Sequence, residues 1–204
     1  MTGYLITVEG PDGSGKSTQA HLLADHLGAL YTREPGGTEL GEELRDMVLD
    51  PNGEGLSDRA EALMIAAARA QHVEEVVRPA IEQGKNVVSD RFIESSVAYQ
   101  GHGRGLGPEE IFDISIFATQ SLKADLIVLI DVDAPLAANR RGKNLDRIEK
   151  AGDDFHSRVM SAYREMASED PERWIVVDGS GTVAEVSERV IDQVQVRLGK
   201  YEKD

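Results

Sequence analysis

The amino-acid sequence predicts an α/β protein whose helices flank a central parallel sheet of five strands. Five short apolar segments are bounded by Asp, Gly or Lys, as strands usually are, and segments with helical patterns separate them. The apolar runs are unbroken rather than alternating, which indicates strands covered on both faces, and strands that alternate with helices form parallel sheets. The expected strands are Tyr4–Val8, Leu30–Arg33, Asn86–Ser89, Leu126–Ile130 and Trp174–Val177.

Helix boundaries are marked by a few local signals. A helical pattern follows the first strand from Ser17 to about Leu27. Pro108 directly follows a glycine and should open a later helix in its first turn, where its missing N–H is tolerated. Thr182 and Glu185 have the spacing of a capping box, so the last helix is expected to begin between them.

The longest expected helix runs from about Ser57 to Gln83, and Pro79 should bend it or mark its final turn. Its small and apolar residues form one face, and a second face presents Ile65, Arg69 and His72 at i, i+4 and i+7. The residues of the first face are Ala60, Leu63, Met64, Ala67 and Ala70.

Composition excludes several classes of protein. The chain has 204 residues without a Pro- or Ser-rich linker, so one domain over residues 1–204 is expected, and without cysteines it has neither disulfides nor thiolate metal sites. Its net charge of −15 argues against nucleic acid as a partner. The longest apolar run, Ala62–Ala68, is too short to span a membrane, and no secretory signal is visible. We expect a cytoplasmic protein with no membrane partner.

Residues 10–17, GPDGSGKS, match the phosphate-loop pattern G-x-x-x-x-G-K-[ST] in the context that its mechanism requires, after a strand and before a helix. The glycines let backbone N–H groups converge on phosphate oxygens, Lys16 supplies positive charge for the outer phosphates, and the Ser17 hydroxyl can coordinate magnesium. The loop therefore predicts binding of a nucleoside triphosphate. The residues expected to surround it are Gly10, Pro11, Asp12, Gly13, Ser14, Gly15, Lys16, Ser17 and Thr18.

Asp90 and Arg91 follow the third expected strand, so they should lie at the carboxyl end of the sheet, where open α/β folds bind their ligands. A carboxylate at this place can orient magnesium or a water bound to it. An arginine can span donor and acceptor phosphates with its forked N–H groups. We therefore expect Asp90 to take part in the metal site and Arg91 in phosphate binding.

Beyond the phosphate loop the chain resembles bacterial thymidylate kinases over essentially its whole length. The matching segments, in the order of the family, are GPDGSGKST, TREPGGTELGEELR, ARAQHV, SDRFIESSVAYQGHGRGLG and LDRIE. The resemblance implies the P-loop nucleoside monophosphate kinase fold, with three layers and a short lid. It also implies transfer of the γ-phosphoryl group of ATP to the 5′-phosphate of dTMP, a Mg²⁺ cofactor and a homodimer.

The resemblance also implies an acceptor site. Arg45 would grip the acceptor phosphate, Asp12 would lie near the 3′-hydroxyl, and Tyr99 would crowd the 2′ position and so favour deoxyribose. The full set of expected acceptor-site residues is Asp12, Glu34, Pro35, Arg45, Ile65, Arg69, Arg91, Ser95, Ser96, Tyr99 and Gln100.

Ile65 departs from the family pattern, which commonly has phenylalanine here, stacked on the thymine. An aliphatic side chain can still cover the face of the base, but it forfeits aromatic stacking worth about 1 kcal/mol. Kinases for another monophosphate, such as dUMP or a ribonucleotide, therefore stay open as an alternative. An ATP-binding regulator without phosphoryl transfer is a second alternative.

Residues 140–150 form the expected lid. Five of these eleven residues are basic and two are acidic, so the segment carries +3 in a chain of −15, as a flap that closes over anions requires. Members of the family carry a catalytic arginine either in the phosphate loop or on the lid, and the loop here has none. The lid should therefore supply it through Arg141 and Arg147, with Arg140 as an alternative, alongside Lys16 and Arg91.

Overall fold

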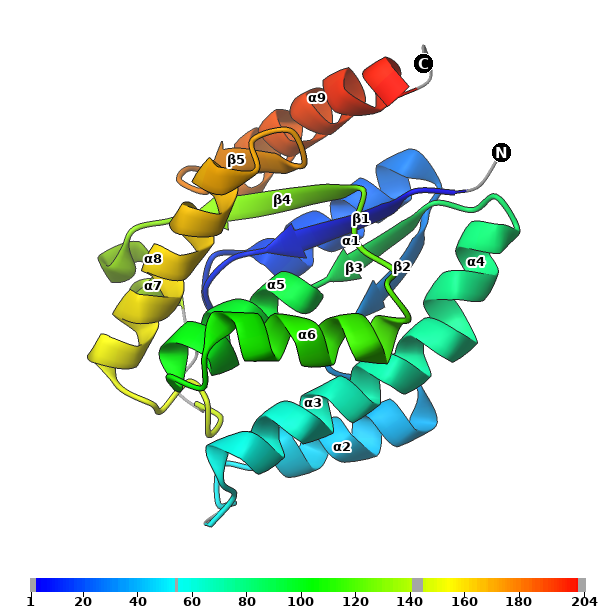
Figure 1. The fold of residues 1–204 in the computed structure, drawn as a ribbon. Helices are drawn as coiled ribbons and strands as arrows, with labels where there is room; N and C mark the ends of the chain where they lie inside the picture. Colours follow the sequence, from blue (N-terminus) through cyan, green and yellow to red (C-terminus); the bar gives the residue numbers. More distant parts are fainter. Residues whose placement is uncertain (1–2, 54, 141–144, 202–204) are drawn as a thin grey trace.

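Five parallel strands form one sheet in the order β2-β3-β1-β4-β5 in the computed structural model, which describes residues 3–53, 55–140 and 145–201 (Figure 1). All five expected strands are present, and each boundary lies within one residue of its predicted position. The strands are β1 (Leu5–Glu9), β2 (Leu30–Arg33), β3 (Val87–Asp90), β4 (Leu126–Asp131) and β5 (Trp174–Asp178).

Helices cover both faces of the sheet and complete the expected three layers. On one face, α1 (Lys16–Leu27) and α9 (Val183–Tyr201) pack against each other and against apolar side chains of the strands (Figure 1). The other face is covered by helices from the middle of the chain, which enclose a second, larger apolar core. These are α2 (Glu39–Leu49), α3 (Asp58–His72), α5 (Ile93–Ser96), α6 (Pro108–Thr119) and α8 (Asp153–Glu169), with the short α7 (Ala134–Arg140) after β4.

The long expected helix is continuous but not uniform. It consists of α3, the π-helical segment η1 (Val73–Val77) and α4 (Arg78–Glu82). The N–H of Arg78 reaches back five residues to the carbonyl of Val73, directly before Pro79, which has no N–H to continue an α-helical ladder. The proline therefore coincides with a change in hydrogen-bond register. A second π-helical segment, η2 (Val97–Gly103), continues α5.

The small apolar face of α3 is only partly covered, with Met64 packed against the core. Leu63 is 57% exposed, whereas Ile65, Arg69 and His72 are buried. The second face of the predicted helix is therefore the one directed into the protein, and it includes the fully buried Glu61 one turn earlier. A helix face with two charged side chains in the interior requires polar partners there.

The other helix signals are confirmed. α6 begins at Pro108. At the start of α9, the Thr182 N–H donates to Glu185 Oε2 (2.8 Å), and the Glu185 N–H donates to Thr182 Oγ1 (3.3 Å), which is the reciprocal pattern of a capping box. None of the helices in the described ranges is both long and apolar enough to cross a membrane.

Candidate active site

The carboxyl ends of β1, β2 and β3 lie side by side and bring three loops together. In the parallel register Val8 of β1 is opposite Asp90 of β3, which in turn is opposite Arg33 of β2. The loops that leave these strands begin at Gly10, Glu34 and Arg91, so residues far apart in the sequence meet at one edge of the sheet.

The phosphate loop folds as its glycines permit. Gly10 has a φ of 144°, and a Cβ there would lie 2.7 Å from the Ile130 carbonyl oxygen, so this close approach requires glycine. Gly15 caps α1 in the left-handed region with a φ of 90°. The Lys16 N–H donates to Ser14 Oγ (3.3 Å). The loop thereby sets Lys16 and Ser17 at the positive end of α1, as the motif predicts.

A cavity of about 310 Å³, here called the strand-end cavity, lies at these loops. Most of the predicted site residues line it: Asp12, Gly13, Lys16, Ser17, Glu34, Pro35, Arg45, Ile65, Arg69, Asp90, Arg91, Ser95, Ser96, Tyr99 and Gln100. Gly10, Pro11, Ser14, Gly15 and Thr18 are not in its lining. Residues that sequence reasoning missed also contribute: Arg33, Leu49, Phe92, Asp146, Ile148 and Glu149.

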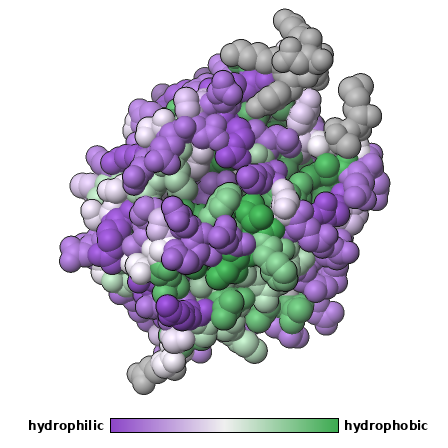
Figure 2. Space-filling view, viewed as in Figure 1, coloured by the Kyte–Doolittle hydropathy of each residue, from purple (hydrophilic) through white to green (hydrophobic). Residues whose placement is uncertain are grey.

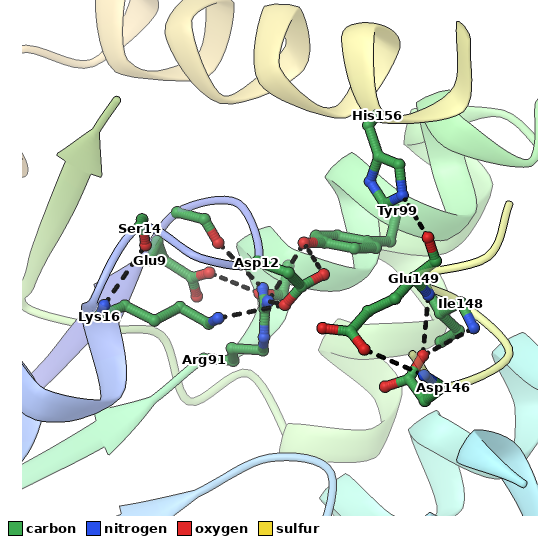
Figure 3. Close-up of polar contacts among 12 residues, drawn as sticks. Glu9, Asp12, Ser14, Lys16, Arg91, Tyr99, Asp146, Ile148, Glu149 and His156 are labelled. Atoms are coloured by element: carbon green, nitrogen blue, oxygen red, sulfur yellow. Dashed lines mark hydrogen bonds and ion pairs between the residues drawn. The ribbon is translucent and has the colours of Figure 1, made fainter. Parts of the chain in front are cut away.

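Asp12 is the centre of a charged cluster in this cavity. Lys16, Arg91 and Tyr99 all point toward it (Figure 3). Asp12 Oδ1 accepts from Lys16 Nζ at 3.2 Å and from Arg91 Nη2 at 2.5 Å, and Oδ2 accepts from the Tyr99 hydroxyl at 2.8 Å. Burial alone would raise the pKa of Asp12, but the charges of Arg91 and Lys16 outweigh it and hold this pKa well below its usual range. The carboxylate is ionised at neutral pH.

Arg91 is held in an unusual conformation by a second layer of side chains. Its φ of 74° lies in the left-handed region, which costs energy for a residue with a side chain. Its Nη1 donates to Ser95 Oγ (2.9 Å) and to the Tyr163 hydroxyl (3.2 Å). Behind them Glu9 accepts from Ser95 Oγ at 2.6 Å and from the Tyr163 hydroxyl at 3.0 Å. Burial raises the pKa of Glu9 despite these donors.

Three guanidinium groups converge on the same side of the cavity. Arg33, Arg45 and Arg91 all line it, and the pKa of Arg45 is lowered by burial, by the charge of Arg33 and by that of Arg91. Arg45 is fixed by a hydrogen bond from Nη1 to the Pro35 carbonyl (2.7 Å). The three guanidinium groups repel one another, and a bound anion would relieve this repulsion. The arrangement therefore suits a phosphate group.

Arg69 is buried, and its guanidinium makes four hydrogen bonds within the described residues. It donates to Glu34 Oε2 at 2.7 Å and, at 2.9 Å each, to Ser115 Oγ, the Phe92 carbonyl and Ser96 Oγ. The other oxygen of Glu34 lies 2.9 Å from His72 Nδ1. Although burial would raise the pKa of Glu34, Arg69 and His72 hold it low. Arg69 therefore fixes the loop after β2 and α5 around the cavity.

Apolar side chains form one wall of the strand-end cavity. Ile65 lines it together with Leu49, Phe92 and Ile148. Ile148 is placed there by a tight turn, in which Asp146 Oδ1 accepts from the N–H groups of Ile148 and Glu149, both at 2.8 Å (Figure 3). The aliphatic side chain at position 65 thus belongs to the apolar part of the lining, in the same cavity as Arg33, Arg45 and Arg91.

The structure does not bring Arg147 to the phosphate loop. Its Nη2 donates to Glu61 Oε2 (2.6 Å) and its Nε to the Val48 carbonyl (3.0 Å), so its guanidinium is bound between α2 and α3. Arg140 lies nearer the loop and donates to the Ser14 carbonyl (3.4 Å) and the Gly179 carbonyl (2.9 Å). Arg141, the other arginine expected to be catalytic, lies outside the described residues.

A metal ion would find oxygen ligands in the cavity. Ser17 and Asp90 both line it, and Asp90 Oδ1 is buried without a hydrogen-bond partner. A buried, unpartnered carboxylate oxygen costs free energy unless a cation or a water binds it. Together with phosphate oxygens, a hydroxyl and a carboxylate are the ligands that Mg²⁺ prefers.

Glu61 is the most consequential residue that sequence reasoning missed. Besides Arg147, it accepts from Gln100 Nε2 (2.8 Å) and from Arg104 Nη2 (3.0 Å). The signal was present in the sequence, because Glu61 precedes Ile65 and Arg69 at intervals of four on the same helix face. A charged residue in line with two expected site residues predicts a polar partner for the site, and Glu61 has this position, because it does not line the cavity but binds Gln100, which does.

Comparisons with known proteins agree with one another. The model of a family described as thymidylate kinase matches residues 8–190. The chain is 41% identical over 208 residues to a thymidylate kinase of Lactobacillus helveticus, covering 97% of this chain and 98% of the relative. It is 50% identical over 186 residues to one of Clavibacter sepedonicus, covering 87% and 88%. The crystal structure of thymidylate kinase from Ehrlichia chaffeensis matches with a TM-score of 0.80 at 31% identity, covering 95% of this chain and 100% of that one.

Proposed function

Because the chain belongs to the thymidylate kinase family, we propose that the strand-end cavity holds dTMP against the γ-phosphate of ATP. The enzyme transfers the γ-phosphoryl group of ATP to dTMP and releases dTDP and ADP, a reaction of nucleotide biosynthesis. The lining of the cavity supports this assignment of the site. Lys16 of the phosphate loop and the arginine pair Arg33 and Arg45 border the same space, so two phosphorylated ligands can meet in it.

The acceptor end of the site follows from charge and shape. Arg45 and Arg33 would bind the 5′-phosphate of dTMP, and the apolar wall with Ile65 would cover the thymine. Asp12 would accept from the 3′-hydroxyl, and the Tyr99 ring would exclude a 2′-hydroxyl. Arg91 is hydrogen-bonded to Asp12 and to Ser95. From this position the forked N–H groups of its guanidinium could contact the phosphates of both ATP and dTMP.

We propose Mg²⁺ as the cofactor, held by Ser17 and Asp90. When bound with ATP, this ion would neutralise charge on the phosphates of the nucleotide. Lys16 would bind the outer phosphates, and Arg91 would lie beside the transferring group. The attacking phosphate oxygen is already anionic near neutral pH, so no strong general base is required, and catalysis rests on alignment and charge neutralisation.

The proposed roles can be tested with purified protein and chromatographic detection of dTDP and ADP. Wild-type protein with ATP, Mg²⁺ and dTMP should form both products in equal amounts, and an excess of EDTA should stop the reaction. Lys16→Ala should lose transfer and keep its fold, as judged by circular dichroism. Turnover near the wild-type rate in Lys16→Ala would contradict the role of the loop.

We also propose a homodimer, expected from the family, and a cytoplasmic location. Hydrophobic residues gather over α3 and α6 in Figure 2, and two large apolar side chains on these neighbouring helices are exposed, Phe117 by 87% and Leu63 by 57%. The exposure of Phe117 and Leu63 favours an interface with a second chain at this place. Light scattering after size exclusion should give twice the chain mass, and Phe117→Glu should give a monomer. A wild-type monomer would contradict the proposal.

A further inference from the structure

A second cavity, of about 570 Å³, lies away from the strand-end cavity, and we call it the acidic groove. Its walls come from α6 and α8, and α5 lies between these two helices (Figure 1). The lining residues are Ile93, Glu94, Val97, His102, Pro108, Glu109, Phe112, Asp113, Glu165, Met166, Glu169, Asp170, Arg173 and Trp174. The two cavities have no lining residue in common. The single turn of α5 nevertheless contributes to both, with Glu94 in the groove and Ser95 in the strand-end cavity.

The acidic groove has many more carboxylates than cations. Six of its fourteen lining residues are Asp or Glu, against one arginine and one histidine. The arginine, Arg173, is already paired with Asp170 (2.6 Å). The other five carboxylates have no ion pair within the described residues. Such a concentration of one charge in a concave surface creates a potential that attracts cations.

Glu94 is the residue that points to a ligand. It lines the groove and is only 8% exposed, and its Oε2 is buried without any hydrogen-bond partner. A carboxylate in this situation is costly unless it is protonated or paired with a cation. Burial and the nearby Glu9 raise the pKa of Glu94 to about 7. The charges of Arg173 and Arg69 offset this rise only in part, and a cation bound in the groove beside Glu94 would stabilise the ionised form further.

The lining of the groove suits an aliphatic organic cation better than a compact metal ion. Its carboxylates are spread over α5, α6 and α8, and no three Asp, Glu or His side chains of the described residues are close enough to share a metal ion. The lining also includes the apolar side chains of Phe112, Met166 and Trp174. Methylene groups can be buried on such surfaces while ammonium groups pair with the carboxylates at either end.

We propose that the acidic groove is a binding site for an aliphatic di- or polyamine, with one ammonium group paired with Glu94 and the methylene chain packed between α6 and α8. The volume is that of a small-molecule site. The acidic groove is a different cavity from the one assigned to the two nucleotides, so diamine binding does not depend on which acceptor the kinase uses.

Isothermal titration calorimetry with the full chain and no nucleotide tests this site. The probes are 1,6-diaminohexane, the uncharged 1,6-hexanediol of the same length, and Mg²⁺. The variants are Glu94→Gln, which keeps the shape of the side chain, and Glu188→Gln, which removes an equal charge from the exposed surface of α9. We expect the diamine to bind wild type and Glu188→Gln alike and to bind Glu94→Gln about tenfold or more weakly. The diol should not bind, and Mg²⁺ should not displace the diamine at equal concentration.

Four results would overturn the proposal: no binding of the diamine to wild type, equal weakening in both variants, equal binding of the diol, or displacement by Mg²⁺. Equal weakening would mean that the diamine responds only to the net charge of the chain. If thermal unfolding shows that Glu94→Gln does not fold, the double variant Asp113→Asn, Glu169→Gln replaces it, because both side chains are exposed. Diamine binding should then weaken severalfold, and unchanged binding would refute the site.

Discussion

Arg147 and Glu61 form an ion pair of 2.6 Å that joins the segment after α7 to the buried face of α3. Burial would raise the pKa of Glu61, but hydrogen bonds from Arg104, Gln100 and Arg147 lower it, so the carboxylate is ionised at neutral pH. Because Ile148 follows Arg147 and lines the strand-end cavity, the pair also positions part of the apolar wall. In this structure the Arg147 guanidinium is therefore bound to Glu61 and to the Val48 carbonyl and is not directed at the phosphate loop.

Arg147→Ala should therefore raise the KM for dTMP more than it lowers kcat, because the wall at Ile148 loses its attachment. Removing one partner of a buried ion pair costs about 3–5 kcal/mol, so thermal stability should also fall. Steady-state kinetics with dTMP and ATP varied separately measures the effect. Arg164→Ala, which breaks an exposed pair with Asp131, is the matched control and should be neutral. A fall in kcat with an unchanged KM would instead assign Arg147 to the transferring phosphoryl group.

Arg45→Ala should raise the KM for dTMP about ten- to a hundredfold, since a charged hydrogen-bond donor to the acceptor phosphate contributes about 1.5–3 kcal/mol. The KM for ATP should change little, because Lys16 and the loop bind the donor. Arg33→Ala is expected to have a smaller effect, as Arg33 already forms an ion pair with Glu42 at 2.7 Å. If Arg45→Ala changed only the KM for ATP, Arg45 would belong to the donor site and not to the acceptor site.

Ile65→Phe should restore stacking on the base and lower the KM for dTMP about fivefold, equivalent to about 1 kcal/mol. The same substitution should lower the KM for dUMP by a similar factor, because both pyrimidines present the same face to the side chain at position 65. Leu49, Phe92 and Ile148 surround the position, so Ile65→Leu serves as a control for packing without an aromatic ring. If Ile65→Leu had the same effect as Ile65→Phe, stacking would not be the cause.

Glu94 should make stability depend on pH between about 5 and 8. Its pKa is raised from 4.5 to about 7, so the folded state binds more protons than the unfolded state in this range, and stability falls as pH rises through 7. Urea unfolding at pH 5 and pH 8 should show a loss of about 2–3 kcal/mol that Glu94→Gln reduces. If the unfolding free energy of wild type and of Glu94→Gln depended on pH in the same way, Glu94 would not be the group responsible. Other charged groups near Glu94 or in the groove are Glu9, Arg69, His102, Glu109, Asp113, Glu165, Glu169, Asp170 and Arg173.

The fold could be predicted from the sequence because its signals are local. Unbroken apolar strands, the glycines of the phosphate loop, Pro108 and the capping box at Thr182 each determine structure within a few residues. The π-helical register at Val73–Val77 could not be predicted, since it depends on how a proline is accommodated within a helix packed on the core.

The lining of the strand-end cavity was predictable for residues that belong to motifs, and much less so the residues behind it that hold those side chains in place. Lys16, Asp12 and Arg91 belong to motifs with a known geometry. Glu9 and Tyr163, which hold Arg91 and Ser95, are 154 positions apart and come together only in the folded chain. Arg147 shows the same limit, because its basic neighbours suggested a phosphate partner, whereas the fold brings it to the buried carboxylate of Glu61.

Relative rates with four nucleoside monophosphates test dTMP as the acceptor most directly. Initial rates with ATP and Mg²⁺ would be measured for dTMP, dUMP, UMP and CMP, with Lys16→Ala as the inactive control. We predict the highest kcat/KM for dTMP, a lower value for dUMP, and much lower values for the two ribonucleotides. Tyr99 is held against Asp12, and in the proposed site its ring would exclude a 2′-hydroxyl. A preference for UMP over dTMP, or no formation of dTDP at all, would contradict the account.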